Sequence, residues 1–411
     1  MSAKKLARLA KEAQKILWAL DEEKRTQAIL SVAKKIQEKK DLIVEANQKD
    51  IKKAHEENFS DALIDRLTLN ESRIQSMVEG VTSIAQSPKV VGAIISEHKR
   101  EDGLLIQKER IPLGVIAMIF ESRPNVIIDC SVLALKSGNA ICLKGGKEAQ
   151  ESNRILAQIV KEAIKETIDP NVIQLLDSRE DVTEILSLRG IIDVVIPRGG
   201  EQLIKYVYDN SKIPVIAHFK GLCHIYVHED ADLEKAREIC LNAKLQRPGV
   251  RNAMETLLVH KSIAERFLSK LLPEFHQNKV ELRACSQTVQ IFSKAMEATL
   301  GDYYTEYLDK ILSIKIVSSL EEAISHIEEH GTKHTEAIIA NDSKAIEIFQ
   351  KNVDASCLMV NASTRFNDGS ELGLGAEIGI STTKIHAYGP MGSQEMTTAR
   401  YIVKGEGHTR T

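Results

Sequence analysis

The feature that most constrains the fold is a regular alternation of apolar runs and amphipathic stretches that begins at Pro112. The apolar runs are short and almost continuous, as in Gly114–Phe120 and Ala140–Lys144. The stretches between them carry apolar residues at helical spacing, as in 148–166. Buried parallel strands joined by helices have this pattern, because helices cover both faces of the sheet. The alternation therefore predicts an α/β fold built on parallel sheets.

Two series of strands are expected, and a length of 411 residues favours at least two domains. The strands of the first series are predicted at Gly114–Phe120, Ala140–Lys144, Val172–Leu176, Ile191–Ile196 and Pro214–Ala217. The second series starts near Asn242, with strands predicted at Thr256–Val259, Ile314–Val317, Ala337–Ala340 and Cys357–Val360. Parallel sheets bind ligands at the carboxyl ends of their strands, so the loops that follow these strands are the first candidates for a site.

The remaining segments read differently. The first ninety or so residues predict helices, the first with an apolar stripe formed by Leu6, Leu9, Ala13, Ile16 and Leu20. A capped helix start is predicted at Asn70. The polar, weakly alternating segment 97–111 predicts an exposed β-ribbon, with which the mixed polar residues after Gly389 could pair.

Composition excludes several classes of function. The formal net charge is −3 without any basic patch, which argues against nucleic-acid and membrane partners. The longest apolar runs have strand length, and the first residues lack an apolar signal core, so a cytoplasmic protein is expected. The six cysteines are scattered without a CxxC pair, which argues against a zinc cluster or a disulfide framework, and no metal is expected.

Two glycine-containing loops with cationic residues enter predicted helices. They are 144–147, which reads Lys-Gly-Gly-Lys, and 198–200, which reads Arg-Gly-Gly. Glycine allows close backbone approach, helix N-termini present free N–H groups, and cations complement phosphate. Either loop alone is weak evidence, because a glycine turn before a helix is more often structural, but two in one sheet favour a nucleotide phosphate site. The glycines at 373, 375 and 379 do not have the G-x-G-x-x-G spacing, so a dinucleotide would bind in another mode.

Two further loops are rich in hydrogen-bonding side chains. Segment 121–125, Glu-Ser-Arg-Pro-Asn, follows the most apolar predicted strand, and its Arg and Asn suit an anionic or carbonyl oxygen. The alternative is a simple helix start with proline near the first position. Segment 361–369 follows another buried run, and so many polar side chains there indicate a ligand loop rather than a turn.

Taken in order, five motifs resemble those of the γ-glutamyl phosphate reductase (glutamate-5-semialdehyde dehydrogenase) family of the aldehyde dehydrogenase superfamily. The motifs span 119–126, 143–148, 196–200, 360–366 and 373–377, and the resemblance runs essentially from end to end. It implies an aldehyde dehydrogenase-like fold with two Rossmann-like parallel-sheet domains and a β-ribbon oligomerisation flap. The implied division gives 1–96 and 112–241 to the cofactor domain, 242–375 to the catalytic domain, 97–111 and 388–411 to the flap, and 376–387 to a return segment.

The resemblance also implies an activity. Members of the family reduce γ-glutamyl phosphate with NADPH, giving glutamate 5-semialdehyde, NADP⁺ and phosphate for proline biosynthesis. A cysteine thiolate attacks the acyl phosphate, hydride reduces the resulting thioester, and the thiohemiacetal collapses to the aldehyde. A homo-oligomer is implied, with transfer of the substrate from glutamate 5-kinase as a further possibility.

Roles for individual residues follow from the same resemblance. The implied cofactor contacts are Lys144, Gly145, Gly146, Arg198, Gly199, Gly200 and Glu306. Asn125 and Arg123 are implied to face the carbonyl and phosphate oxygens. The implied contacts to the rest of the substrate are Asn361, Ser363, Thr364, Arg365 and Glu377. The stretch 217–221 contains no carboxylate, which fits a reductase, because a water-activating base would waste the intermediate.

The chain departs from the family at the nucleophile. The family has cysteine within a Gln-Arg-Pro-x-x-Cys-Asn segment, whereas residues 246–252 here have Arg251 at that position. Arginine stays protonated and offers only hydrogen-bond donors, so it cannot form an acyl thioester. The sequence therefore predicts little or no reductase activity. Two alternatives remain open: a non-catalytic NADPH-binding or regulatory relative, and a CoA-acylating aldehyde dehydrogenase.

Overall fold

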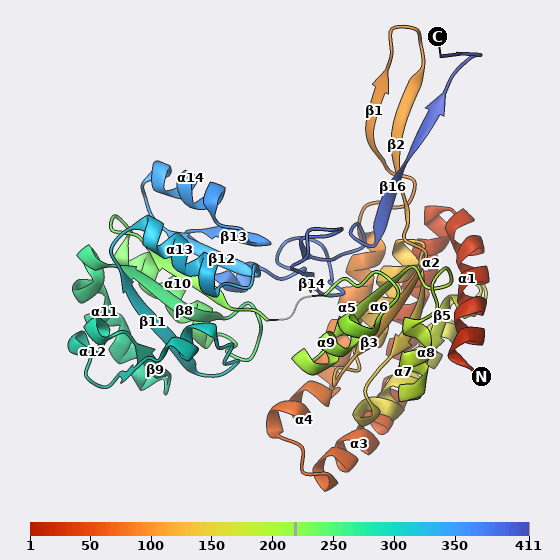
Figure 1. Cartoon of the computed structure of the whole chain (residues 1–411). Coiled ribbons are helices and arrows are strands. Elements are labelled where there is room, and N and C mark those ends of the chain that lie inside the picture. Colours follow the sequence, from red (N-terminus) through yellow and green to blue (C-terminus); the bar gives the residue numbers. More distant parts are fainter. Residues whose placement is uncertain (218–219, 411) are drawn as a thin grey trace. The chain divides into compact units, whose positions relative to one another are not determined.

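The computed structural model describes residues 1–217 and 220–410, and the chain forms two compact units (Figure 1). The first unit combines 1–217, 373–379 and 391–411, and the second combines 218–372 and 380–390. The boundary therefore follows residue 217, not residue 241 as the implied division has it. Strand β7 (Cys223–Val227) explains the difference, because it lies between two other strands of the second unit's sheet and cannot belong to the first.

The sheet of the first unit has four parallel strands in the order β5-β4-β3-β6. Their bounds are β3 Val115–Phe120, β4 Ala140–Lys144, β5 Ile173–Leu175 and β6 Val194–Arg198. The chain adds β4 and β5 on one side of β3 and then returns to add β6 on the other side. The strand order thus reverses at β3, which is where sheets of this kind bind ligands. The run Pro214–Ala217 forms only an isolated bridge, between Val195 and Val215, instead of the expected strand.

Helices lie on both faces of this sheet. Helices α1, α8 and α9 pack on one side, and α6 and α7 on the other, where α2, α3 and α5 add a further layer. The helices are α1 Ala3–Ala19, α2 Glu22–Glu38, α3 Lys40–Glu56, α4 Asp61–Leu67, α5 Glu71–Gln86, α6 Val126–Lys136, α7 Gln150–Ile164, α8 Arg179–Leu186 and α9 Glu201–Asn210. The start predicted at Asn70 is confirmed, because its side chain caps α5 by accepting the N–H of Arg73.

The stripe predicted for α1 is wrong. The buried face consists of Ala3, Ala7, Ala10, Ala13 and Leu17, whereas Ile16 is 59% exposed. Alanine side chains let this helix pack closely against β3, β4 and β5, so small residues rather than large ones mark its inner face.

The predicted ribbon is present as a three-stranded antiparallel sheet that projects from the first unit (Figure 1). Its strands are β1 Ile94–Lys99, β2 Leu105–Pro112 and β16 Thr397–Lys404. Strand β16 pairs with β2 along its whole length, from Thr397 opposite Pro112 to Lys404 opposite Leu105. The pairing expected between the ribbon and the C-terminal segment is therefore confirmed, and we call this sheet the flap.

The second unit has seven parallel strands in the order β10-β9-β11-β8-β7-β12-β13. Besides β7, they are β8 Met254–His260, β9 Glu281–Ala284, β10 Met296–Glu297, β11 Ile311–Val317, β12 Thr335–Ile339 and β13 Cys357–Val360. One hydrophobic core lies between the sheet and α10 (Leu233–Leu245) and α11 (Lys261–Gln277). A second core lies under α13 (Leu320–His330) and α14 (Ser343–Asn352).

Short elements complete the chain. They are α12 Ser286–Ile291, the 3₁₀ helices η1 Lys147–Ala149, η2 Pro170–Val172, η3 Leu300–Tyr304 and η4 Thr364–Phe366, and the antiparallel pair β14 Ile380–Ser381 and β15 Gly389–Pro390. The α/β fold built on two parallel sheets that the sequence predicts is confirmed. Among the helices of the described residues, none is long and apolar enough to cross a membrane.

Candidate active site

In the first unit, two of the predicted loops meet where the strand order reverses. Strands β3 and β6 are neighbours, with Phe120 opposite Arg198. The backbone N–H of Glu121 donates to the carbonyl oxygen of Arg198 at 3.1 Å. The N–H of Gly200, at the start of α9, donates to Oε2 of Glu121 at 2.8 Å. The chain thus places one of its own carboxylates at this helix N-terminus, where backbone N–H groups favour an anion.

The loop after β4 contacts the loop after β3. Glu148 Oε1 accepts the backbone N–H of Ser122 at 2.7 Å and its hydroxyl at 2.9 Å, which connects this loop to the one after β3. Lys144 is almost fully buried, and its Nζ donates to the carbonyl oxygen of Gly145 at 2.6 Å. Burial lowers the pKa of Lys144, while Glu148 and nearby aspartates oppose that shift. Gly145 packs closely, because a Cβ there would lie 2.2 Å from Nδ2 of Asn153 and that side chain would have to move.

Asn125 and Arg198 are each held by an acidic residue nearby. The Nδ2 of Asn125 donates to Oδ2 of Asp129 at 2.8 Å, one turn along α6. Burial raises the pKa of Asp129 to about 6, against the effects of Asn125 and Arg198. Arg198 donates to the carbonyl oxygen of Ile378 at 2.7 Å and lies 3.8 Å from Glu377. The structure therefore brings the proposed cofactor residue Arg198 beside the proposed substrate residue Glu377, and Arg123 lies in the same loop as Asn125.

Asp129 was missed by the sequence analysis. Its spacing of four residues from Asn125 at the start of a helix was the available signal, because side chains at i and i+4 are neighbours on a helix.

In the second unit, Arg251 lies in the turn between α10 and β8. Its carbonyl oxygen accepts the Cys223 thiol, with Sγ at 3.2 Å. Gly221 packs so closely that a Cβ there would lie 2.2 Å from the same oxygen. The N–H of Gly221 donates to Oε1 of Glu306 at 2.8 Å, and an Arg251 guanidinium nitrogen lies 4.0 Å from that carboxylate oxygen. Arg251 and Glu306 are thus brought together on a tightly fixed backbone.

No described cysteine offers a thiolate at this turn. Cys223 is buried, and its pKa is raised well above the ordinary value by burial and then by Glu336. Burial also raises the pKa of Cys130, Cys142, Cys240 and Cys357. All six cysteines are free thiols.

The segment 361–367 splits into two parts. Asn361 pairs with both backbone groups of Ala340, accepting its N–H at 3.0 Å and donating to its oxygen at 2.9 Å, so the amide is used within the fold. Arg365 instead contacts the neighbour of Arg251: its guanidinium donates to Oδ1 of Asn252 and, through Nε, to Gln246 at 2.8 Å. The two ends of the predicted substrate loop therefore lie in different places.

Between these two ends, Ser363 and Thr364 are buried. The Ser363 hydroxyl accepts the N–H of Arg365 at 3.3 Å. In return, Asn252 donates to the carbonyl oxygens of Arg365 and Asn367, at 3.3 and 2.9 Å. These bonds hold the last part of the segment against the turn that contains Arg251.

A buried ion pair joins α10 and β8, the two elements on either side of the turn that contains Arg251. The sequence did not predict this pair. Lys244 Nζ donates to Glu255 Oε2 at 2.9 Å, and both side chains are at most 1% exposed. Glu255 Oε1 also accepts the N–H of Leu308 at 3.1 Å. Burial raises the pKa of Glu255 to about 7 and lowers that of Lys244. Neither residue stands in a motif, so a lysine inside an amphipathic helix looked like a surface residue.

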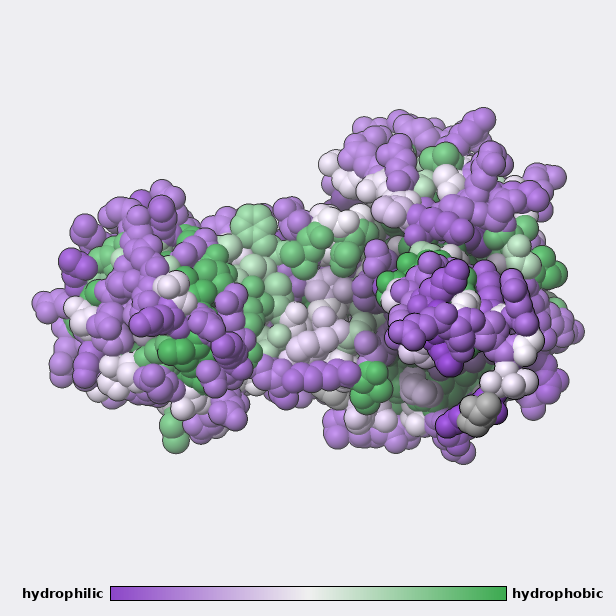
Figure 2. Space-filling model, turned by 90° about the horizontal axis from the view of Figure 1, so that it is seen from above, coloured by the Kyte–Doolittle hydropathy of each residue, from purple (hydrophilic) through white to green (hydrophobic). Residues whose placement is uncertain are grey.

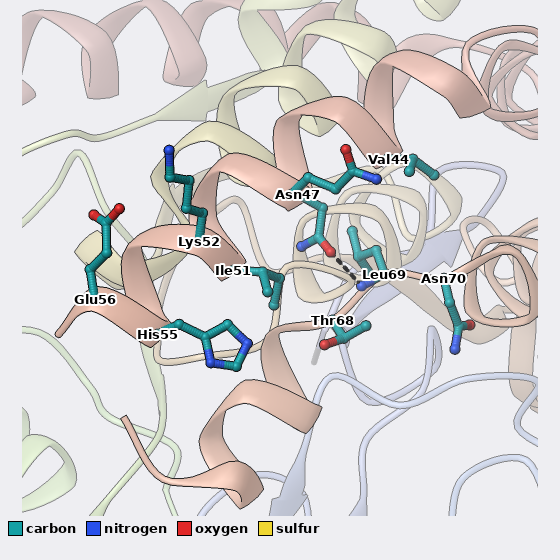
Figure 3. Close-up of a pocket in the computed structure, with 10 residues that line it drawn as sticks. Val44, Asn47, Ile51, Lys52, His55, Glu56, Thr68, Leu69 and Asn70 are labelled. Atoms are coloured by element: carbon teal, nitrogen blue, oxygen red, sulfur yellow. Dashed lines mark hydrogen bonds between the residues drawn. The ribbon is translucent and has the colours of Figure 1, made fainter. Parts of the chain in front are cut away.

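A cavity of about 590 Å³ lies elsewhere, between α3 and the segment before α5 (Figure 3). Ile51, Val44 and Leu69 give it apolar walls, and the Asn47 amide accepts the N–H of Leu69 at 2.7 Å. No residue predicted to bind cofactor or substrate is among its lining residues. The lining residues are Val44, Asn47, Gln48, Ile51, Lys52, His55, Glu56, Thr68, Leu69 and Asn70. In the stretch 217–221, noted above for its lack of a carboxylate, residues 218 and 219 lie outside the described part of the chain.

Comparisons with known proteins identify the family of the chain. Residues 1–309 match the model of the aldehyde dehydrogenase family. The gamma-glutamyl phosphate reductase of Dictyoglomus thermophilum is 49% identical over 404 residues, which cover 98% of this chain and 97% of the relative. That of Carboxydothermus hydrogenoformans is 48% identical, with 98% of each chain covered. The crystal structure of gamma-glutamyl phosphate reductase from Thermotoga maritima has a TM-score of 0.97 and 42% identity, with both chains fully covered. This chain therefore belongs to the γ-glutamyl phosphate reductases of the aldehyde dehydrogenase family.

Proposed function

We propose that the chain has the scaffold of an NADPH-dependent, cytoplasmic γ-glutamyl phosphate reductase and that Arg251 leaves it with little or no catalytic activity. The reaction of the scaffold converts γ-glutamyl phosphate, an acyl phosphate of the kind that a glutamate kinase supplies, into glutamate 5-semialdehyde and phosphate. The relatives reported above are named for this activity, and this chain matches them over nearly their whole lengths.

The proposed loss of activity rests on the surroundings of Arg251. Its backbone is fixed by Cys223 and Gly221, so the side chain at position 251 starts from a well-defined place. Arginine offers five N–H donors and no nucleophilic lone pair at neutral pH. Such a side chain can hold an acyl phosphate by its oxygens but cannot displace the phosphate. Removal of a covalent nucleophile costs on the order of 10⁴- to 10⁶-fold in turnover.

The loops of the first unit fit a phosphorylated dinucleotide. The Glu121 carboxylate at the N–H of Gly200 marks a place where an anion is accepted, and a pyrophosphate oxygen has the same requirements. Lys144, on the neighbouring strand, supplies a cation for the ribose or its 2′-phosphate. Glu306 in the second unit supplies a carboxylate for a ribose hydroxyl. When bound, NADPH would supply hydride to the acyl carbon.

The other residues of the site position the substrate. Asn125, held by Asp129, presents an amide suited to the acyl oxygen. Arg365, held by Asn252 and Gln246, and Arg123 present cations suited to the phosphate or the α-carboxylate. Ser363, Thr364 and Glu377 remain proposals for the amino-acid end of the substrate. The pairing of Asn361 with Ala340 gives that residue a structural role instead.

The direct test is the Arg251→Cys variant, assayed by NADP⁺-dependent oxidation of glutamate 5-semialdehyde with phosphate. We expect the unaltered chain to be inactive and the variant to turn over at least 10⁴-fold faster. The matched control is Arg251→Ala, which removes the guanidinium without adding a thiol and should stay inactive. Ordinary turnover by the unaltered chain, or a covalent glutamyl adduct on it, would refute the proposal.

A second candidate function is a non-catalytic relative that binds NADPH and regulates. Arg251 and its ion-pair distance to Glu306 are the observations that favour it. Tight NADPH binding with no turnover even by Arg251→Cys would support this candidate over the first. The same variant, offered a CoA thioester and acyl phosphate side by side, also tests a CoA-acylating activity, for which a preference for the thioester is the signature.

The flap is the proposed contact between copies of the chain. It projects from the first unit and exposes large apolar residues, with Ile95 47%, Tyr401 69% and Val403 57% exposed. Figure 2, which looks down on the side from which the flap projects, shows hydrophobic residues scattered among hydrophilic ones. The edge strands of the flap, β1 and β16, are pairing surfaces of a common kind. Sedimentation of the chain and of a Tyr401→Lys variant tests this, since a flap contact should be weakened by the added charge.

A further inference from the structure

A cluster of aromatic side chains lies under α13, on the face of the second unit's sheet opposite α11. His326 and His330 stand one turn apart on α13, with ring centroids 4.2 Å apart. His224 of β7 meets His326 edge to face at 5.6 Å. Tyr303 and Tyr304 of η3 complete the cluster, at 5.1 Å from His326 and 4.3 Å from His330 respectively. We call these five residues the histidine cluster.

The three histidines of the cluster are buried and incompletely hydrogen-bonded. His224, His326 and His330 are 0%, 3% and 7% exposed. Nε2 of His224, Nε2 of His326 and Nδ1 of His330 are buried without a hydrogen-bond partner among the described residues. Neutral imidazoles tolerate such a place far better than imidazolium ions do, because burying an unpaired charge costs much more than burying a polar group.

The charges that face the cluster do not compensate a proton on His326. Lys315 of β11 places Nζ 3.4 Å from Nδ1 of His326, and its own counter-ion, Glu322, is 3.8 Å from Nζ. Glu336 of β12 is paired with His224 at 2.9 Å. These neighbours leave a protonated His326 between a lysine and two other histidines.

His330 is slightly better placed. Glu329 lies 3.9 Å from its Nε2, but this carboxylate is largely exposed and also accepts the Tyr304 hydroxyl at 3.1 Å. Burial, followed by the repulsion of His224, His330 and Lys315, lowers the pKa of His326 to about 2. Burial also lowers the pKa of His330, with Glu329 opposing the shift.

We infer that α13 is an acid-released helix: protonation of His326 and His330 drives it off the sheet at a pH at which the first unit remains folded. Two imidazolium rings cannot stay 4.2 Å apart beside Lys315, and moving α13 takes both of them to solvent together. The apolar contacts that oppose this movement come from Leu320, Ala323 and Ile327, with Ile324 packed beside them. This inference does not depend on the proposed enzymatic function.

The direction of the effect follows from linkage. Both histidines have a lower pKa in the folded state than the ordinary 6.5, so folding favours their neutral forms. Their contribution to stability is complete above pH 6.5 and is lost as the pH falls below it. Between pH 7 and pH 5, the opening equilibrium of α13 should rise about 25-fold if one histidine titrates and about 600-fold if both do.

The test is native-state hydrogen exchange on the full chain at pH 7 and pH 5, corrected for the intrinsic exchange rates. We expect amides of 320–330 to lose protection by between about 25-fold and about 600-fold. Amides of α1 and the fluorescence of Trp18, the single tryptophan of the chain, report on the first unit and should stay unchanged.

The variants His326→Gln and His330→Gln keep a neutral polar side chain that does not titrate, and each should remove about one proton from the pH dependence. His276→Gln removes an exposed histidine of α11 and is the matched control, with no expected effect. If either cluster variant fails to fold, the pH dependence of the unaltered chain still decides. The inference is overturned if α13 loses less than threefold protection, if α1 opens in parallel, or if both glutamine variants keep the full pH dependence.

Discussion

The buried pair of Lys244 and Glu255 allows a prediction whose size follows from the structure. In Lys244→Met the side chain keeps roughly its length and volume but loses the ammonium group that pairs with Glu255 Oε2 at 2.9 Å, in a site that is at most 1% exposed. Leaving a buried charge unpaired costs about 3–5 kcal/mol. The second unit should therefore open roughly two to three and a half orders of magnitude more often than in the unaltered chain.

The assay is hydrogen exchange of the amides of β8, the strand that contains Glu255. We expect these amides to exchange only when the unit unfolds. A matched control is Lys270→Met on α11, which removes an exposed lysine 3.8 Å from Glu234. Pairs at the surface contribute at most about 1 kcal/mol, so this control should change protection by less than about fivefold.

The pH dependence supplies a second check. Without Lys244, burial acts unopposed on Glu255 and moves its pKa further above the value of about 7. A carboxyl group with a raised folded-state pKa destabilises the fold at high pH and ceases to do so as it becomes protonated. The difference between the variant and the unaltered chain should thus shrink between pH 8 and pH 6. A cost below 1 kcal/mol, or a cost independent of pH, would refute the reasoning.

Three further substitutions test other contacts. Gly221→Ala places a Cβ 2.2 Å from the carbonyl oxygen of Arg251, so residues 247–253 should shift and lose exchange protection at least tenfold, whereas Gly301→Ala, in the same unit, adds a Cβ that meets no atom closer than 3.7 Å and should leave that protection unchanged. Asp50→Ala removes the carboxylate that caps α7 through the N–H groups of Glu151 and Ser152, and should lower the unfolding free energy of the first unit by about 1–2 kcal/mol, measured by Trp18 fluorescence in urea. Glu121→Gln removes a negative charge from the start of α9 and should tighten NADPH binding a few-fold in a fluorescence titration; weaker binding would show that Glu121 does not compete with the cofactor.

Much of the fold follows from the sequence because strand-length apolar runs have few alternatives. Strands β4 and β13 begin and end at the predicted residues, and the loops after β3, β4 and β6 meet as the rule for parallel sheets requires. The face of α1 could not be read in the same way. Its inner side is marked by alanines, and hydrophobic patterns give more weight to large side chains that here reach solvent.

The site of the second unit could not be predicted from the strand pattern. Gly221 and Arg251 precede β7 and β8, so they lie at the amino ends of strands, where the rule does not place a ligand. Family resemblance, not strand pattern, directed attention to them. The contacts of Cys223 with Arg251 and of Lys244 with Glu255 depend on how distant segments pack, and no local spacing in the sequence encodes them.

The division of the chain into segments has a consequence for synthesis. The first unit needs residues 391–411, and its flap pairs Leu105 with Lys404, almost three hundred residues later. The second unit is nearly complete once residue 372 has been made, and it lacks only 380–390. A nascent chain on the ribosome can therefore form the parallel sheets of both units before the flap is complete, because β2 must wait for β16 to emerge.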